Sequence, residues 1–464
     1  MANDRDRQVV RHIAPRPPGR SVGTVARVFA LTLVPSLLAA PPTMAQAQAP
    51  ATPSAPSDQA PAPAPAVPAA ATAPTWPVSG IYTAPDTKDL GTLTGLSWLK
   101  GTKVRGWVDG FYEYNANSPD RAMEAANTAS IIKAQNLTIE GRTFDVHDRS
   151  FTLSLAEIEV EKVPEIGGAG FKVDLAFGET QEIIVNTIRG RVGAAAPGDF
   201  VQEFDKVFQH ASVSYVVPVG RGLRLDFGKF VTHIGGETIE TVKNWNYSHA
   251  FFYTYAIPFQ DTGLHVSYPW SDTFYTDVYV LNGWNTTIDN NRTPSIGASI
   301  GAVPVPWLSI YLNYLGGPEQ PNNNSNLRHL ADAQLFLGPL GPLNFLLNFD
   351  YGTEKNAIGG AQNATWWGVA GMVRYKVTEE IEPSIRLEYY DDADGFTTGT
   401  VQKLWEGTFT LNVKLGAAQS AGGLFLFRPE VRFDKSNKNF FSKNSALAST
   451  DSQFTVGAGL AYLF

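Results

Sequence analysis

The sequence has no cysteine among its 464 residues. It can therefore form no disulfide framework, no thiolate metal site and no cysteine nucleophile, as expected of a protein exported unfolded through an oxidising compartment. It also lacks an uninterrupted apolar run of about 18 residues, the length that a membrane-spanning helix needs. The apolar stretch Leu335–Phe349 is broken by two Gly-Pro pairs. These absences exclude a helical membrane protein.

Motifs for catalysis and for ligand binding are scarce too. The seven histidines show neither His-x-x-x-His nor His-Glu-x-x-His spacing. Asp391–Gly395 is acidic but is not an EF-hand loop, because Tyr390 stands at the first ligand position. Ser267 and His265 share one face of a predicted strand, yet no third partner completes a catalytic triad. We predict no catalytic residue, no metal or cofactor site and no nucleic-acid partner.

The first 47 residues have the layout of an export signal. Six arginines precede the apolar segment Val28–Ala40, and Ala45–Ala47 is a small-x-small cleavage site. We predict a signal peptide over 1–47 that is removed, with a retained signal anchor as the alternative. Because this segment holds six Arg and two Asp, 30 basic and 42 acidic side chains remain, a net charge near −12.

A segment rich in Ala and Pro follows over 48–78, and its composition offers neither a core nor a hydrogen-bond ladder. We predict a disordered linker there, acting as a plain spacer or as a cell-wall contact. Residues 79–102 form a short lead-in, in which Leu96–Lys100 could make one helical turn. The folded domain is predicted to span 103–464.

The last fourteen residues alternate strictly between two faces, the pattern of a β-strand. One face is wholly apolar, and the strand has the length that crosses a bilayer when tilted. An open sheet edge cannot exist in lipid, so such a strand must belong to a closed barrel. The residues of the apolar face are Phe454, Val456, Ala458, Leu460, Tyr462 and Phe464.

Sixteen segments of this kind occupy the predicted domain, which makes the fold class all-β. Long polar connections follow the odd-numbered segments and tight Gly/Pro turns follow the even-numbered ones. This alternation predicts a transmembrane antiparallel β-barrel of about sixteen strands with both termini at the short-turn end. The strands are expected near 103–116, 151–164, 171–183, 204–218, 223–232, 262–269, 272–284, 295–304, 308–316, 327–337, 342–353, 365–378, 380–391, 403–416, 423–435 and 451–464.

Charged residues alternate with apolar ones in several strands, and this fixes which face is which. A charge on the lipid face near the midplane costs roughly 2–4 kcal/mol, so these charges must face the interior. Pro429 in a charged strand predicts a β-bulge. Within 151–161 the alternation changes phase near Ala156, which leaves the register of that strand open.

A polar interior in a sixteen-stranded barrel predicts an aqueous channel. The alternative is a plugged barrel whose inward charges only neutralise one another. The third long connection, 233–261, is rich in aromatic residues, and we expect it to fold inward as a constriction; a cap at the barrel rim or a subunit contact is the alternative. The predicted lining and constriction residues are Glu237, Glu240, Lys243, Arg328, Arg374, Arg386, Glu388, Glu406, Lys414, Arg428, Glu430 and Arg432. The net charge near −12, with a mixed set of inward acids and bases, predicts a mild cation preference at low salt.

Three stretches, Leu225–Glu237, Asn246–Phe259 and Gly316–Gln320, resemble the OmpL-like β-barrel porin family, and the resemblance extends over about 101–464. His233, Gly236 and His249 depart from the family pattern. The family implies an outer-membrane porin of Gram-negative bacteria, without cofactor, passing small hydrophilic solutes, with the lead-in and both termini in the periplasm. A surface structural or adhesion barrel is the alternative. The C-terminal residues Leu460, Tyr462 and Phe464 resemble the signal that the barrel assembly machinery recognises, and monomer and homotrimer both stay open.

Overall fold

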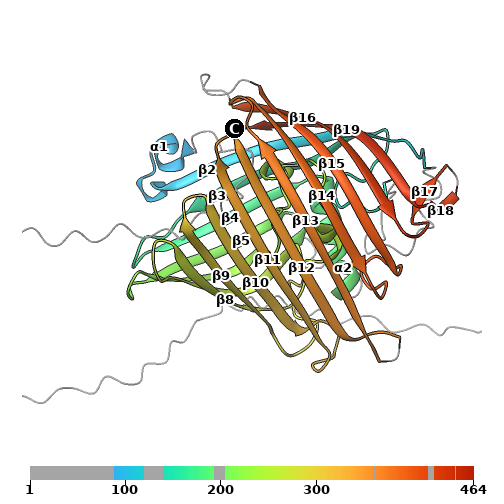
Figure 1. Cartoon of the computed structure of the whole chain (residues 1–464). Helices are drawn as coiled ribbons and strands as arrows, with labels where there is room; N and C mark the ends of the chain where they lie inside the picture. The colour runs from blue at the N-terminus through green and yellow to red at the C-terminus, as the bar shows by residue number, and fades with distance from the viewer. Residues whose placement is uncertain (1–87, 120–138, 193–203, 360, 416–422, 445) are drawn as a thin grey trace, which may run out of the picture. The chain divides into compact units, whose positions relative to one another are not determined.

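A computed structural model describes residues 88–119, 139–192, 204–359, 361–415, 423–444 and 446–464 (Figure 1). The signal peptide predicted over 1–47 and the linker predicted over 48–78 lie outside the described residues. Of the lead-in, the structure describes the two-residue strand β1 (Lys88–Asp89), the helix α1 (Leu90–Thr94) and the 3₁₀ turn η1 (Ser97–Leu99). The turn falls inside the segment predicted for it.

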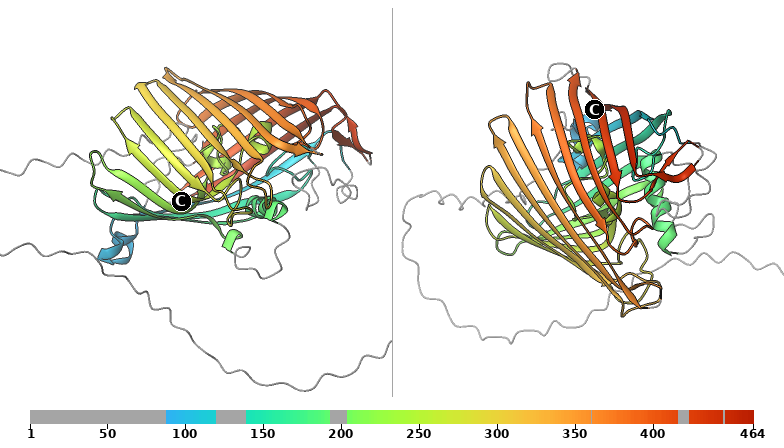
Figure 2. Two further views of the ribbon diagram at one scale, coloured as in Figure 1. Left: turned by 90° about the horizontal axis from the view of Figure 1, so that it is seen from below. Right: turned by 45° about the vertical axis from the view of Figure 1, so that its right-hand side comes forward.

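Sixteen long antiparallel strands form a closed barrel (Figures 1 and 2). Each strand pairs with its neighbour in sequence, and the C-terminal strand β19 pairs with both β16 and β2 to close the ring. All sixteen coincide with predicted strands. They are β2 (Thr102–Asn115), β3 (Phe151–Lys162), β4 (Ala169–Phe177), β5 (Phe208–Val217), β6 (Leu223–Val231), β7 (Gln260–Pro269), β8 (Phe274–Leu281), β9 (Ser295–Val305), β10 (Leu308–Pro318), β11 (Leu327–Leu340), β12 (Leu343–Ile358), β13 (Gln362–Tyr375), β14 (Ile381–Asp392), β15 (Gln402–Leu415), β16 (Leu424–Ser436) and β19 (Ser452–Leu463).

The alternation between the two faces is the one that the sequence predicts. In β16 the apolar side chains of Phe425, Phe427, Val431 and Phe433 are exposed on the outside, and the charged side chains of Arg428, Glu430, Arg432 and Asp434 are buried inside. The same division holds along β14 and β15. An apolar outer surface over a charged interior fits a barrel whose solvent outside is lipid.

Several predicted strand boundaries are wrong, and the largest differences lie in two regions. The strand expected to reach residue 183 ends at Phe177, because Gly178 adopts a φ of 122° and the helix α2 (Glu179–Val192) begins. Glu179 and Glu182 lie in the first turn of α2, where negative charge stabilises a helix. The long connection expected over 354–364 is mostly strand, since β12 continues to Ile358 and β13 starts at Gln362.

The predicted irregularities are also corrected. Pro429 causes no bulge, because the register between β15 and β16 is the same on both sides of it. Thr410 faces Glu430 on one side, and Val413 faces Phe427 on the other. The phase change in β3 is a bulge at Ser154, since Asp109 faces Leu155 while the next residue of β2 faces Leu153. A bulge adds one residue to one strand, which moves the following side chains to the other face.

The remaining elements lie in the connections at the long-loop end. Besides α2 they include a small hairpin, β17 (Phe441–Lys443) with β18 (Ala446–Thr450), and two short helical elements between β6 and β7. Among the residues that the structure describes, no helix is long and apolar enough to cross a membrane. The largest buried cluster of apolar side chains is built around the connection between β6 and β7.

Candidate pore constriction

The connection between β6 and β7, residues 232–259, packs against the inner face of the barrel. It contains a 3₁₀ turn, η3 (Thr241–Lys243), and a short helix, α4 (Phe251–Tyr255). We call residues 233–261 the inner loop. Its aromatic side chains are at most 6% exposed; they are Trp245, Tyr247, Phe251, Phe252, Tyr253 and Tyr255. Such a segment would lose this burial if it extended into solvent, because burying aromatic surface is strongly favourable.

Two carboxylates of the barrel wall bind the backbone of the inner loop. Glu430 accepts hydrogen bonds from the backbone N–H groups of Tyr247 (2.7 Å) and Ser248 (3.1 Å). Glu388 accepts from the N–H groups of Phe251 and Phe252, each at 2.6 Å. The first N–H groups of a helix have no partner within it, so Glu388 satisfies the N-terminus of α4 with a charge of the favourable sign. The wall thereby replaces water as the partner of this buried backbone.

Three arginines of the wall bind carbonyl oxygens of the same loop. Arg428 donates to the carbonyl of Asn244 (2.8 Å), and Arg432 donates to that of His249 (2.6 Å). Arg386 donates to the carbonyl of Ser248. The guanidinium of Arg432 also lies over the ring of Phe251, 4.9 Å from its centroid. Hydrogen bonds to charged groups are about twice as strong as neutral ones, so these contacts hold the loop against β14 and β16.

An ion-pair network connects the loop to the wall. Glu237 and Arg386 are 2.6 Å apart, and Arg386 also pairs with Glu406 at 2.6 Å. Arg432 pairs with Glu406 (3.3 Å) and with Asp434 (2.6 Å), and all of these side chains are buried. Of the predicted lining residues, five bind the inner loop, Glu237 belongs to it, and Glu406 is bound by Arg386 and Arg432. The five are Arg386, Glu388, Arg428, Glu430 and Arg432.

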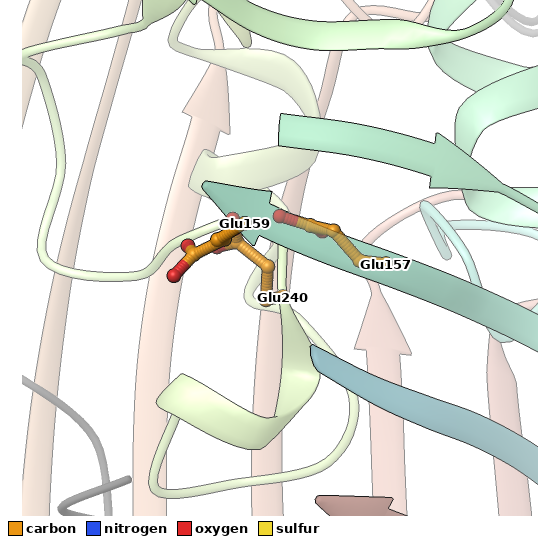
Figure 3. A group of neighbouring side chains, drawn as sticks. All are labelled: Glu157, Glu159 and Glu240. Carbon is orange, nitrogen blue, oxygen red and sulfur yellow. The ribbon is translucent and has the colours of Figure 1, made fainter. Parts of the chain in front are cut away.

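Glu240 and Lys243 lie on the opposite side of the loop, against β3 and β5. Lys243 pairs with Glu159 (2.7 Å) and with Glu240 (3.2 Å), and Gln209 donates to Glu240 (2.7 Å). Glu240, Glu159 and Glu157 form an acidic group whose oxygens lie within 4.8 Å of one another (Figure 3). The ammonium of Lys243 already binds two of the three carboxylates, so we assign an ion-pair cluster rather than a metal site.

The other predicted lining residues lie nearer the two ends of the barrel. Lys414 pairs with Glu382 (2.9 Å), and Arg374 lies 3.9 Å from the same carboxylate, near the short-turn end. The guanidinium of Arg374 also lies over the ring of Trp245 in the inner loop, 4.7 Å from its centroid. Arg328 binds Glu354 at the long-loop end, where its guanidinium lies over aromatic rings.

His249 is buried within the inner loop, between the rings of Phe144 and Tyr253. Burial lowers the pKa of His249 to about 4. Its Nε2 atom lies 2.7 Å from the carbonyl oxygen of Thr238. This contact joins two parts of the inner loop that are 11 residues apart in the chain. A neutral imidazole in this position adds no charge to the arginines around it.

The wall that faces the loop carries further polar residues. His265 bridges Asp226 (2.9 Å) and Asp277 (3.3 Å) across β6, β7 and β8. Asp332 accepts hydrogen bonds from Asn313 and from Asn348, both at 2.6 Å. The strand alternation places all of these residues inside, so that signal is present in the sequence.

A second segment, residues 139–148, also lies inside the barrel and was not predicted to do so. Arg142 donates to Asp434 (3.1 Å) and to Thr455 (2.7 Å), while Phe144 and Val146 join the buried apolar cluster. No periodicity marks this segment in the sequence, since it is part of a long polar connection. The lumen at the long-loop end is thus occupied by two segments of the chain.

Comparisons with known proteins agree with this architecture. A family model described as "Putative beta-barrel porin-2, OmpL-like" matches residues 101–464. The outer membrane channel DcaP of Acinetobacter baumannii is similar in structure, with 11% identity, 78% of this chain and 98% of that chain covered, and a TM-score of 0.50. The anion-selective porin from Comamonas acidovorans has 14% identity, with 78% of this chain and 99% of that chain covered, and a TM-score of 0.47. A search of curated proteins gave no match.

Proposed function

The chain belongs to the OmpL-like family of β-barrel porins, and from this premise we propose that its inner loop forms the constriction of the pore. A member of this family is an outer-membrane β-barrel through which small hydrophilic solutes diffuse passively. A barrel of sixteen strands is wide enough for a water-filled channel unless chain segments narrow it. In this chain the inner loop spans the lumen from β14 to β3, and residues 139–148 lie beside it.

The observation that supports the proposal most directly is the attachment of the loop to the charged residues of one part of the wall. Its hydrogen bonds and ion pairs to charged wall residues concentrate on β14, β16 and β3. On β11 and β12 the loop also has contacts, namely a hydrogen bond from the Gly236 N–H group to Asn348 and the packing of Trp245 against Phe336. Solutes would then pass between the loop and the wall of β6–β10. On that wall the strand alternation places Asp226, His265 and Asn313 on the inner face. A polar lining of this kind suits hydrophilic solutes.

Substituted cysteines test this path, because the chain has no cysteine of its own. Asn313→Cys places a thiol on the inner face of β10, where Asp332 keeps Asn348 as a partner. A charged water-soluble thiol reagent should modify it and lower the single-channel conductance. The matched control is Leu312→Cys on the lipid face, 49% exposed, which should leave the conductance unchanged. Conductance that the reagent leaves intact in Asn313→Cys would place the path elsewhere.

A structural or adhesion barrel with a plugged lumen is the second candidate, and the dense packing of the inner loop and of 139–148 favours it. The two functions differ in one measurement. The purified protein in planar bilayers conducts ions if it is an open porin, and it is silent if the lumen is sealed. Homotrimer formation and recognition by the barrel assembly machinery stay predictions; membrane lipid is the partner that the apolar outer face requires.

A further inference from the structure

Basic side chains gather on the inner face of the barrel close to the short-turn end. Each points inward and pairs with a carboxylate, and five of the six lie near a strand end. They are Arg105 on β2, Lys172 on β4, Arg224 on β6, Arg374 on β13, Lys414 on β15 and Lys243 on the inner loop.

In every one of these pairs the basic partner is the more exposed one. Around Glu159, the side chains of Arg105, Lys172 and Lys243 are 34%, 23% and 28% exposed, whereas that of Glu159 is 1% exposed. Arg224 is 35% exposed and its partner Asp226 is 8% exposed. The water in this half of the lumen therefore contacts cations, and the acids lie behind them.

The physical cause is the length of the side chains. Lys and Arg extend their charged ends past a short carboxylate toward water, while the carboxylate stays close to the backbone. The pair around Glu382 follows the same rule: Lys414 and Arg374 are 14% and 15% exposed, and Glu382 is 8% exposed. Half-buried Glu161 at the end of β3 opposes the trend. So do two acids in the short turns themselves, since Asp272 and Glu379 are more exposed than their partners Arg221 and Lys376.

We propose that the short-turn half of the pore favours small anions such as chloride and the carboxylates of small organic acids. The inference deepens the proposed function and rests on it. A passing anion meets ammonium and guanidinium donors at contact distance, whereas the carboxylates lie farther from it, behind the cations. The net charge near −12, from which a mild cation preference is predicted, gives equal weight to exposed and buried groups.

The test is the reversal potential in a KCl gradient across planar bilayers. The wild type should pass chloride in preference to potassium. Arg224→Gln with Lys414→Gln should lower this preference about twofold, while Asp226 keeps His265 and Glu382 keeps Arg374 as partners. Arg224→Lys with Lys414→Arg should retain it. Lys403→Gln is the matched control, because this lysine lies at the long-loop end of β15.

The outcomes separate the two proposals. A wild-type channel that prefers potassium overturns the anion preference and leaves the porin function standing. An anion preference that survives intact in the double Gln variant also overturns it, since other residues would then set the selectivity. A protein that does not conduct at all contradicts the proposed function itself.

Discussion

Arg386 and Glu237 form a buried ion pair, with 2.6 Å between Nη1 and Oε1. Arg386 belongs to the barrel wall at β14, and Glu237 belongs to the inner loop, 149 residues earlier in the chain. The same guanidinium binds Glu406 and the carbonyl of Ser248. One side chain thus joins a wall strand, its neighbour and the loop, which makes the position of the loop depend on Arg386.

Replacing Arg386 should release the inner loop. Arg386→Gln leaves Glu237 and Glu406 buried with one partner fewer, and breaking a buried pair from one side costs about 3–5 kcal/mol. Because the barrel ladder does not involve this side chain, we expect a folded barrel with a higher and noisier single-channel conductance. The control is Lys403→Gln, because this lysine lies at the long-loop end of β15 and pairs with Asp391. A quiet channel of wild-type conductance in Arg386→Gln would contradict the anchoring role.

Gly459 is needed for the loop to pack. It lies on the inner face of β19 with the ring of Tyr247 directly against its backbone, so a Cβ atom there would overlap the ring. Gly459→Val should displace Tyr247 and destabilise the loop by about 1–3 kcal/mol, the usual cost of overpacking. Protease sensitivity of the loop measures the effect. Gly407→Ala is the control, since its added Cβ meets only Leu387 at ordinary contact distance, 3.4 Å.

The free-energy cost of placing a charge on the lipid-facing surface should depend on its depth in the bilayer. Leu387 lies on the outer face in the middle of β14 and is 63% exposed. Leu387→Arg should cost roughly 2–4 kcal/mol in a urea titration of the barrel folded into liposomes, and Leu327→Arg, at the end of β11, about 0–1 kcal/mol. Equal costs at the two positions would show that β14 does not cross the hydrocarbon region as assigned.

Phe464 should be required for assembly and not for conduction. Its backbone exchanges hydrogen bonds with Gly106, at 2.9 and 3.0 Å, and its side chain is exposed on the outer face. Deleting it removes one lipid-facing aromatic from the folded barrel, a small loss, but it also removes the expected recognition signal. Unassembled protein should then accumulate in the periplasm. Phe454→Ala, at the other end of the same strand, should assemble normally; normal surface levels of the Phe464 deletion would refute the prediction.

The barrel could be predicted from the sequence because the alternation of its strands depends on neighbouring residues. Alternation along each strand is decided by lipid outside and water inside, so the faces of Phe427 and Arg428 follow from neighbouring residues. The bulge at Ser154 was visible only as a phase change. The pairing partners decide where the extra residue lies, and no single strand reveals them.

The contacts of the inner loop could not be predicted from neighbouring residues. Its aromatic content predicted burial, and its charges suggested partners on the wall, but the particular partners depend on long-range geometry. Glu388 binding two backbone N–H groups of α4 is an example, since neither the short helix nor its location could be derived from periodicity. The sequence predicts that inward charged side chains line open water, whereas those of β14 to β16 bind the inner loop.

The central claim, that the inner loop narrows the pore, is tested most directly by the single-channel conductance of a variant lacking Thr238–Ser248. This segment carries Lys243, Trp245 and Tyr247, while the barrel strands and their hydrogen-bond ladder are untouched. We expect a folded barrel with a clearly higher single-channel conductance than that of the wild type. A folded variant whose conductance and ion selectivity equal those of the wild type would contradict it.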